Sequence, residues 1–66
     1  MNASKRAVHR WSSWRLFHLG GAWYELFNLC GEVWIRYQLV RALDDADAIK
    51  QANELILITI KEKLLG

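Results

Sequence analysis

The sequence predicts a small all-α protein, and three observations lead to this fold class. Residues 22–43 place apolar side chains at alternating spacings of three and four, which is the pattern of an amphipathic helix. Residues 44–66 begin with acidic and end with basic side chains, as the helix dipole favours. Two helices of similar length joined by a short turn favour an antiparallel hairpin. We therefore expect a single domain, residues 1–66, in which a short basic N-terminal helix precedes a helical hairpin that oligomerisation completes as a helix bundle.

The N-terminal arm, residues 1–21, is expected to form the short helix. Val8, Trp11 and Trp14 recur every three residues and predict one apolar stripe on an amphipathic helix. Gly20 and Gly21 follow and are expected to end this helix, because residues without a Cβ make its continuation costly and allow a left-handed cap.

The central helix is expected over residues 22–43. Its seam against the next helix is predicted to comprise Trp23, Leu26, Phe27, Val33, Tyr37 and Val40, facing Ile49, Ala52, Ile56 and Ile60. Cys30 also falls on this seam, where a small thiol packs as a hydrophobic residue and is inert. Glu25, Glu32 and Arg36 are expected on the wet side, with Glu32 and Arg36 as an i,i+4 ion pair.

The last helix is expected from Asp45 to Leu65, with Asp44 as its N-cap. The β-branched segment 55–60 would also suit a buried strand, but we identify no second strand with which it could pair. Because neither Gly nor Pro marks the joint at Asp44, one continuous helix through this position is the alternative to a hairpin.

Self-association is expected from the size and composition of the chain. A domain this short buries only about 60% of the surface that its unfolded chain exposes, and 53% of its 66 residues are hydrophobic. A single Cys excludes an internal disulfide, and no Cys/His spacing suits structural zinc. Partner chains are the remaining means of completing the core. The residues predicted for the oligomer interface are Leu55, Leu57 and Ile58.

The sequence predicts no catalytic, metal or cofactor site. His18, Glu25 and Glu32 lie seven residues apart, but the Glu-x-x-His pairs of helical carboxylate metal sites are absent. Neither a glycine-rich phosphate loop nor a nucleophile with a neighbouring base can be identified.

The distribution of charge suggests an anionic partner for the arm. Residues 1–21 carry four basic side chains and no acid, whereas the rest of the chain has a net charge of −2. Basic residues beside tryptophans suit single-stranded nucleic acid or a membrane surface. For a chain short of core, we favour the simpler interpretation in which Trp11 and Trp14 dock on the hairpin and complete its core.

We therefore expect a non-catalytic assembly module that forms a homo-oligomer and binds a larger protein partner. The predicted contact residues are those of the types that dominate binding hot spots, namely Arg10, Trp11, Trp14, Arg15, Trp34 and Arg36. The alternatives are a nucleic-acid-binding regulator that uses the basic arm, or a small subunit of a membrane-associated complex. A lone span over residues 16–35 is disfavoured, because it would bury two carboxylates in the bilayer.

A cytoplasmic location is expected from two features. The charged N-terminus is not followed by an uninterrupted apolar segment, and a single Cys suits a reducing compartment.

Overall fold

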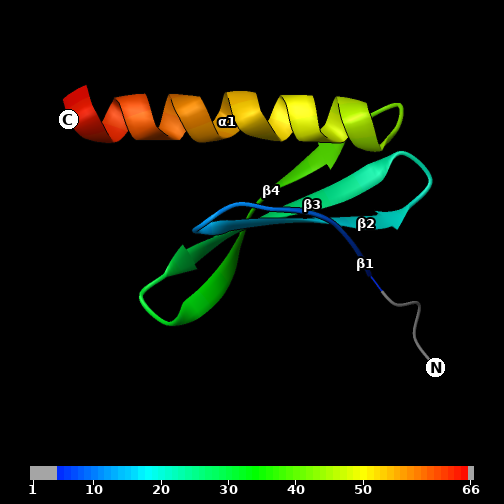
Figure 1. Ribbon diagram of the computed structural model, residues 1–66, viewed down its shortest axis with the longest axis horizontal. Coiled ribbons are helices and arrows are strands. Elements are labelled where there is room, and N and C mark those ends of the chain that lie inside the picture. Colours follow the sequence, from blue (N-terminus) through cyan, green and yellow to red (C-terminus); the bar gives the residue numbers. More distant parts are fainter. Residues whose placement is uncertain (1–4, 66) are drawn as a thin grey trace.

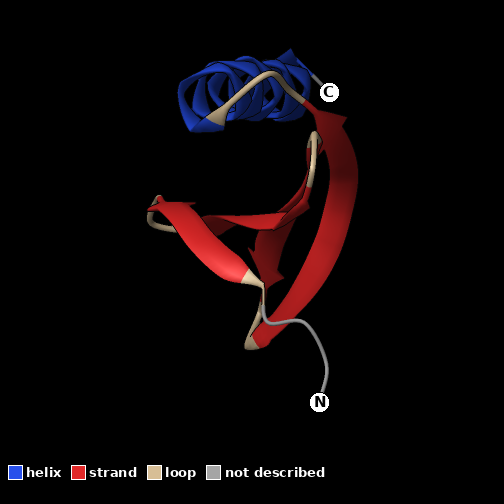
Figure 2. Ribbon diagram, turned by 90° about the vertical axis from the view of Figure 1, so that its right-hand side faces the viewer, coloured by secondary structure: helices blue, strands red, loops and turns tan. Residues whose placement is uncertain are grey.

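The computed structural model describes residues 5–65 and contains four strands followed by one helix. The elements are β1 (Arg6–Arg10), β2 (Trp14–Gly20), β3 (Trp23–Cys30), β4 (Val33–Arg41) and α1 (Asp45–Leu65). The strands form one antiparallel sheet in the order β1-β2-β3-β4, so that neighbours in sequence are neighbours in the sheet. The helix lies on one side of this curled sheet (Figures 1 and 2), and no other helix of the described chain covers the opposite side.

The all-α prediction is wrong, because the expected N-terminal helix and the expected central helix are both strand pairs. Trp23, Tyr24, Phe27 and Val40 belong to the aromatic and β-branched types that favour strands. Along β3, Tyr24 and Leu26 face the helix and are buried in the core, whereas Trp23 lies 47% exposed on the other side. Spacings of three and four selected apolar residues from both faces of the sheet and imitated a helical seam.

Two glycines make the hairpin turns that the helical interpretation overlooked. Gly21 and Gly31 have φ angles of 57° and 66°, and each is the first residue of a two-residue loop. Glycine at the first loop position with φ above zero suits a type II′ turn, which matches the twist of the paired strands. Gly20 therefore closes β2 and Gly21 begins the turn to β3, so neither ends a helix. Gly31 reverses the chain inside the expected central helix.

A β-bulge in β4 turns one aromatic side chain towards the helix. Leu26 pairs with Gln38 and Phe27 with Arg36, so Tyr37 is the extra residue between them. The hydroxyl of Tyr37 lies 2.9 Å from Oγ1 of Thr59 on α1. The bulge thereby ties the middle of the edge strand to the second half of the helix.

The C-terminal helix is the one predicted element that the structure confirms. It spans Asp45–Leu65, and Oδ1 of Asp44 accepts a hydrogen bond of 2.8 Å from the backbone N–H of Asp47. Asp44 is thus the N-cap that the sequence indicates. A continuous helix through Asp44 is excluded, because the preceding element is β4.

The core lies between the helix and one face of the sheet. Leu16 and Leu26 are fully buried and pair directly across β2 and β3. Ala48 and Ala52 are also fully buried, and their small side chains let α1 approach the sheet closely. The buried core residues are Trp14, Leu16, Tyr24, Leu26, Val40, Ala42, Ala48, Ala52 and Ile56.

The predicted seam is correspondingly wrong in part. Val40 and Ile56 are buried in this core, but Trp23 lies on the opposite face of the sheet. Cys30, expected in the buried seam, is an exposed free thiol at the end of β3.

Candidate functional site

The side of the sheet that α1 does not cover, called the open face from here on, gathers aromatic and basic side chains. Strand alternation and the cross-strand pairs assign its members. They are Ala7, Arg10, Arg15, Phe17, Trp23, Glu25, Phe27, Leu29, Trp34, Arg36, Leu39 and Arg41, with Lys5 reaching over them from the N-terminal side.

Each exposed tryptophan of the open face has an arginine beside its ring. The Arg15 guanidinium lies 4.3 Å from the Trp34 ring centroid, and that of Arg41 lies 5.9 Å from the Trp23 ring centroid. Nη1 of Arg15 also donates to the carbonyl oxygens of Trp11 and Trp14, at 2.8 and 2.9 Å. The β1–β2 loop therefore holds Arg15 in place against Trp34.

A buried carboxylate organises the middle of the open face. Glu25 is only 7% exposed, and its oxygens lie 2.8 Å from Nζ of Lys5 and 3.2 Å from Nη1 of Arg36. Burial alone would raise the pKa of Glu25, but the hydrogen bonds and charges of Lys5 and Arg36 hold this pKa below its ordinary value. The expected wet position of Glu25 is therefore wrong, because the strand places it between two cations. The predicted helical ion pair between Glu32 and Arg36 is also wrong, because Arg36 pairs with Glu25.

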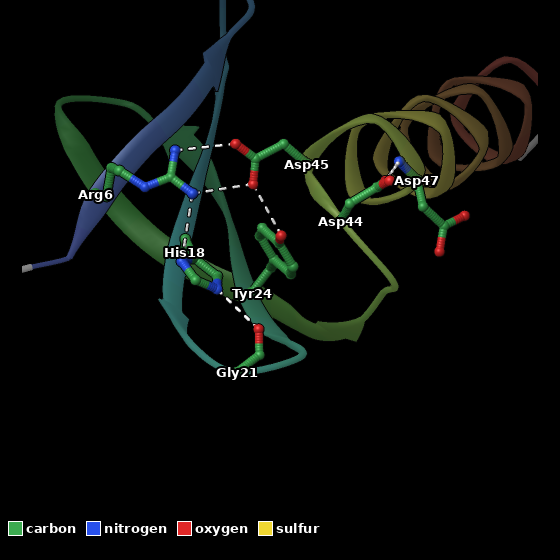
Figure 3. A network of polar contacts seen from close by, with 7 residues as sticks. All are labelled: Arg6, His18, Gly21, Tyr24, Asp44, Asp45 and Asp47. Carbon is green, nitrogen blue, oxygen red and sulfur yellow. Dashed lines mark hydrogen bonds and ion pairs between the residues drawn. The ribbon is translucent and has the colours of Figure 1, made fainter.

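A polar network joins the sheet to the start of the helix (Figure 3). Arg6 of β1 donates to both carboxylate oxygens of Asp45, at 2.9 and 3.0 Å. The Tyr24 hydroxyl donates to Oδ1 of the same carboxylate at 2.8 Å. Nε2 of His18 lies 2.9 Å from the carbonyl oxygen of Gly21, and its Nδ1 lies 3.4 Å from the Arg6 guanidinium.

The electrostatics of this network are those of an anchored helix N-terminus. The hydrogen bonds from Arg6 and Tyr24 lower the pKa of Asp45, and the same bond to Asp45 raises the pKa of Arg6. Burial, followed by the contact with Asp45, raises the pKa of Tyr24. An ionised Asp45 in the first turn of α1 also complements the helix dipole. The network therefore fixes α1 on the sheet, and its polar atoms satisfy one another.

Exposed apolar side chains gather at the opposite end of the helix. We call them the apolar end: Leu57, Ile58, Ile60 and Leu64 of α1, with Val33, Ile35 and Tyr37 of β4. The second half of α1 and the start of β4 lie at the same end of the molecule (Figure 1), and the contact between Tyr37 and Thr59 connects them. The exposed fraction is 57% for Leu57, 61% for Val33 and 81% for Leu64.

The structure distributes the predicted contact residues over two faces. Arg10, Arg15, Trp34 and Arg36 share the open face. Trp14, by contrast, is buried in the core, as in the interpretation in which the arm completes it.

Trp11 lies on the helix side, where its Nε1 donates a hydrogen bond of 2.9 Å to Oδ1 of Asn53. Of the predicted oligomer residues, Leu55 is half-buried against the core, whereas Leu57 and Ile58 are exposed.

Sequence reasoning missed Trp23, Phe17, Arg41 and Lys5 as members of the open face. The signal that could have found the open face was the glycine turn at Gly31, which indicates a hairpin and thereby places Trp23, Glu25, Phe27 and Leu29 on one face of a strand.

Three further observations concern a surface depression, metal binding and membrane-spanning helices. A depression of 390 Å³ on the open face is lined by Ala7, Val8, His9, Arg10, Arg15 and Phe17. Among the described residues, no cluster of three His, Cys, Asp or Glu side chains could hold a metal ion. Within residues 5–65, no helix has both the length and the apolar character needed to cross a membrane.

Comparison of the chain with protein-family models, with curated proteins and with solved structures found no match in any of the three. Its surfaces therefore carry the functional argument.

Proposed function

We propose that the protein is a non-catalytic assembly module whose copies associate through the apolar end. The observation that carries this proposal is that exposed apolar side chains gather on both the second half of α1 and the start of β4, which lie at the same end of the molecule (Figure 1). Full burial of one such side chain contributes about 1.5–3 kcal/mol, so several together can offset the loss of freedom on association.

The area required is available on so small a chain. A stable interface covers about 800 Å² per partner, which is roughly a sixth of the 4863 Å² accessible surface of the structure. A second copy is the occupant that we propose, because the apolar end can bury its own counterpart in an isologous contact. This contact would supply the additional core that a 66-residue chain needs.

The two edges of the sheet differ, and the difference favours association through β4, which contributes to the apolar end. β1 is a five-residue edge strand that carries two arginines and a register shift, which are features that discourage pairing with another chain. β4 is the other edge and the longest strand, with nine residues. Its first part exposes Val33, Trp34 and Ile35 in succession. Edge pairing through this segment would extend the sheet from one copy into the next.

We also propose that the protein is not an enzyme. This proposal is supported by the polar groups that lie together, since Arg6, His18, Tyr24 and Asp45 use their bonding atoms on one another and on Gly21. A cytoplasmic location is also proposed, with the exposed free thiol of Cys30 as its support.

Sedimentation equilibrium at micromolar protein concentrations tests the proposal. We expect the wild-type chain to sediment as a dimer or a larger oligomer. Leu57→Lys and Ile35→Lys should each shift it towards the monomer, because a charge would be buried in the contact. Ala46→Lys is the matched control, since this exposed position lies in the first turn of the same helix, away from the apolar end.

Circular dichroism of each variant separates dissociation from unfolding. A wild-type chain that remains a folded monomer over this concentration range would contradict the proposal. The proposal would also be contradicted if Leu57→Lys and Ile35→Lys both sedimented as the wild type does.

A further inference from the structure

We propose that the open face of the sheet binds single-stranded nucleic acid. The inference concerns the face opposite to α1, and it is independent of association through the apolar end. It extends the predicted use of the N-terminal arm, since Arg10 and Arg15 belong to the arm whereas Trp23, Trp34, Phe27, Arg36 and Arg41 lie on β3 and β4.

Exposed aromatic rings lie at both ends of the open face. Trp23 and Trp34 are 47% and 37% exposed. Trp34 pairs with Leu29, which lies six positions beyond Trp23 on β3, so the two rings are separated by roughly 20 Å along the strands. Phe17 and Phe27 lie between these ends, with their ring centroids 5.6 Å apart. Such a row of rings offers successive stacking surfaces to unpaired bases.

Cationic side chains lie beside these rings. Arg15 lies over Trp34, Arg41 lies near Trp23, and Nζ of Lys5 lies 4.8 Å from the Phe27 ring centroid. A base stacked on one of these rings would carry its phosphate close to a cation. This combination of aromatic platform and basic groove is the one that binds single strands without reading their sequence.

Charge is distributed unevenly across the molecule. The open face carries five cations, Lys5, Arg10, Arg15, Arg36 and Arg41, against the single carboxylate of Glu25. Helix α1 and its cap carry five acids, Asp44, Asp45, Asp47, Glu54 and Glu62, against three lysines, which leaves a net charge of −2. A polyanion is therefore attracted to the open face in preference to the helix.

The arginine pair on β1 and β2 marks one phosphate position. Arg10 and Arg15 stand directly opposite each other, and neither forms an ion pair with a carboxylate of the described residues. Like charges at opposite positions are unfavourable unless an anion lies between them. Both residues line the depression of 390 Å³, together with Phe17. An acidic peptide would match these charges, but it would leave the flat ring surfaces unused.

Fluorescence anisotropy with a labelled single strand of about 12 thymidines or 12 uridines tests the inference. We expect binding at about 50 mM salt and a steep loss of affinity as salt rises. Trp34→Ala and Trp23→Ala should each weaken binding roughly 5- to 100-fold, the loss of one stacked base, and Trp34→Phe should restore most of it. Lys61→Ala is the control, since it removes a cation from the helix side.

Three further probes make the test specific. An abasic strand of the same length should bind at least about tenfold more weakly, because it offers phosphates without stacking. A duplex should also bind more weakly, since its bases are already stacked. The Ile58→Lys variant should retain binding, because Ile58 lies on the helix, away from the open face.

The inference would be overturned by any of three results: no binding of the single strand at low salt, equal affinity for the abasic strand, or tryptophan variants that bind as the wild type does. Binding of anionic phospholipid vesicles in preference to the single strand would likewise overturn it and assign the face to a membrane surface. Circular dichroism of each variant ensures that these outcomes refer to folded protein.

Discussion

The sheet can be tested by truncating two leucines that lie on opposite faces of it. Leu26→Ala removes a fully buried side chain that pairs with Leu16, the other fully buried leucine. Such truncations cost about 2–5 kcal/mol, from lost transfer free energy and the cavity left behind. A 66-residue domain has a free energy of unfolding of roughly 3–10 kcal/mol, so this single change should remove much of its stability.

Leu39→Ala is the matched control on the other face. Leu39 pairs with Glu25 on the open face and is 42% exposed, so its truncation should cost under about 1 kcal/mol. The assay is urea denaturation followed by tryptophan fluorescence and far-ultraviolet circular dichroism, at a protein concentration held constant. Equal losses for the two variants would refute the assignment of faces. A loss below about 0.5 kcal/mol for Leu26→Ala would refute the position of the core.

Three other variants probe local features, each by the same denaturation assay. Asp44→Ala should lower the free energy of unfolding by about 1 kcal/mol through loss of the N-cap, whereas Asp44→Ser should restore most of it; an unchanged stability in the alanine variant would contradict the capping role. Gly31→Ala should cost about 1–2 kcal/mol because its φ is 66°, although a Cβ there would meet no atom within 4 Å; Gly31→Asn should cost less, and equal losses would contradict the backbone explanation. The pKa of Asp45 is lower in the folded than in the unfolded chain, so its contribution is complete above the ordinary carboxyl pKa of about 4 and is lost as the pH falls through the lowered value. Asp45→Asn should therefore lose less stability than the wild type over this acid range, and parallel pH profiles would contradict the role of the Arg6 contact.

The last helix could be predicted because its signals are local. Asp44 accepts a hydrogen bond three residues away, and the acidic first turn acts on the helix that contains it. The competing strand interpretation of residues 55–60 is wrong, because these residues lie within α1. Capping and dipole effects depend on neighbours in sequence, and these neighbours are known before any fold is formed.

The strands were missed because their signals are shared between two faces that are both partly apolar. On β3, Trp23 and Phe27 face the open side and Tyr24 and Leu26 face the core, so the contrast that normally reveals a period of two is weak. The turn at Gly31 was the stronger evidence, because glycine followed by one residue between two apolar segments suits a two-residue hairpin. A helix through this position would have required a glycine in its interior.

The candidate surfaces could likewise be predicted only in part from the sequence. Composition alone indicated more apolar surface than so short a chain can bury, and the exposed Leu57 and Ile58 agree with that expectation. Which side chains share a face could not be read before the pairing was known. Arg15 meets Trp34 across three strands, and Glu25 lies between Lys5 and Arg36 only because the sheet brings them together.

By itself the sequence determined the C-terminal helix and its N-cap, the single free cysteine, the basic character of the first third of the chain and the excess of apolar residues. These properties depend on composition or on contacts within one turn. The tertiary structure alone decided that residues 6–41 form a sheet, that its two faces differ, and that aromatic rings and cations meet on the uncovered one. Pairing between strands joins residues distant in sequence, and a side chain acquires its face only when the register of its strand is set.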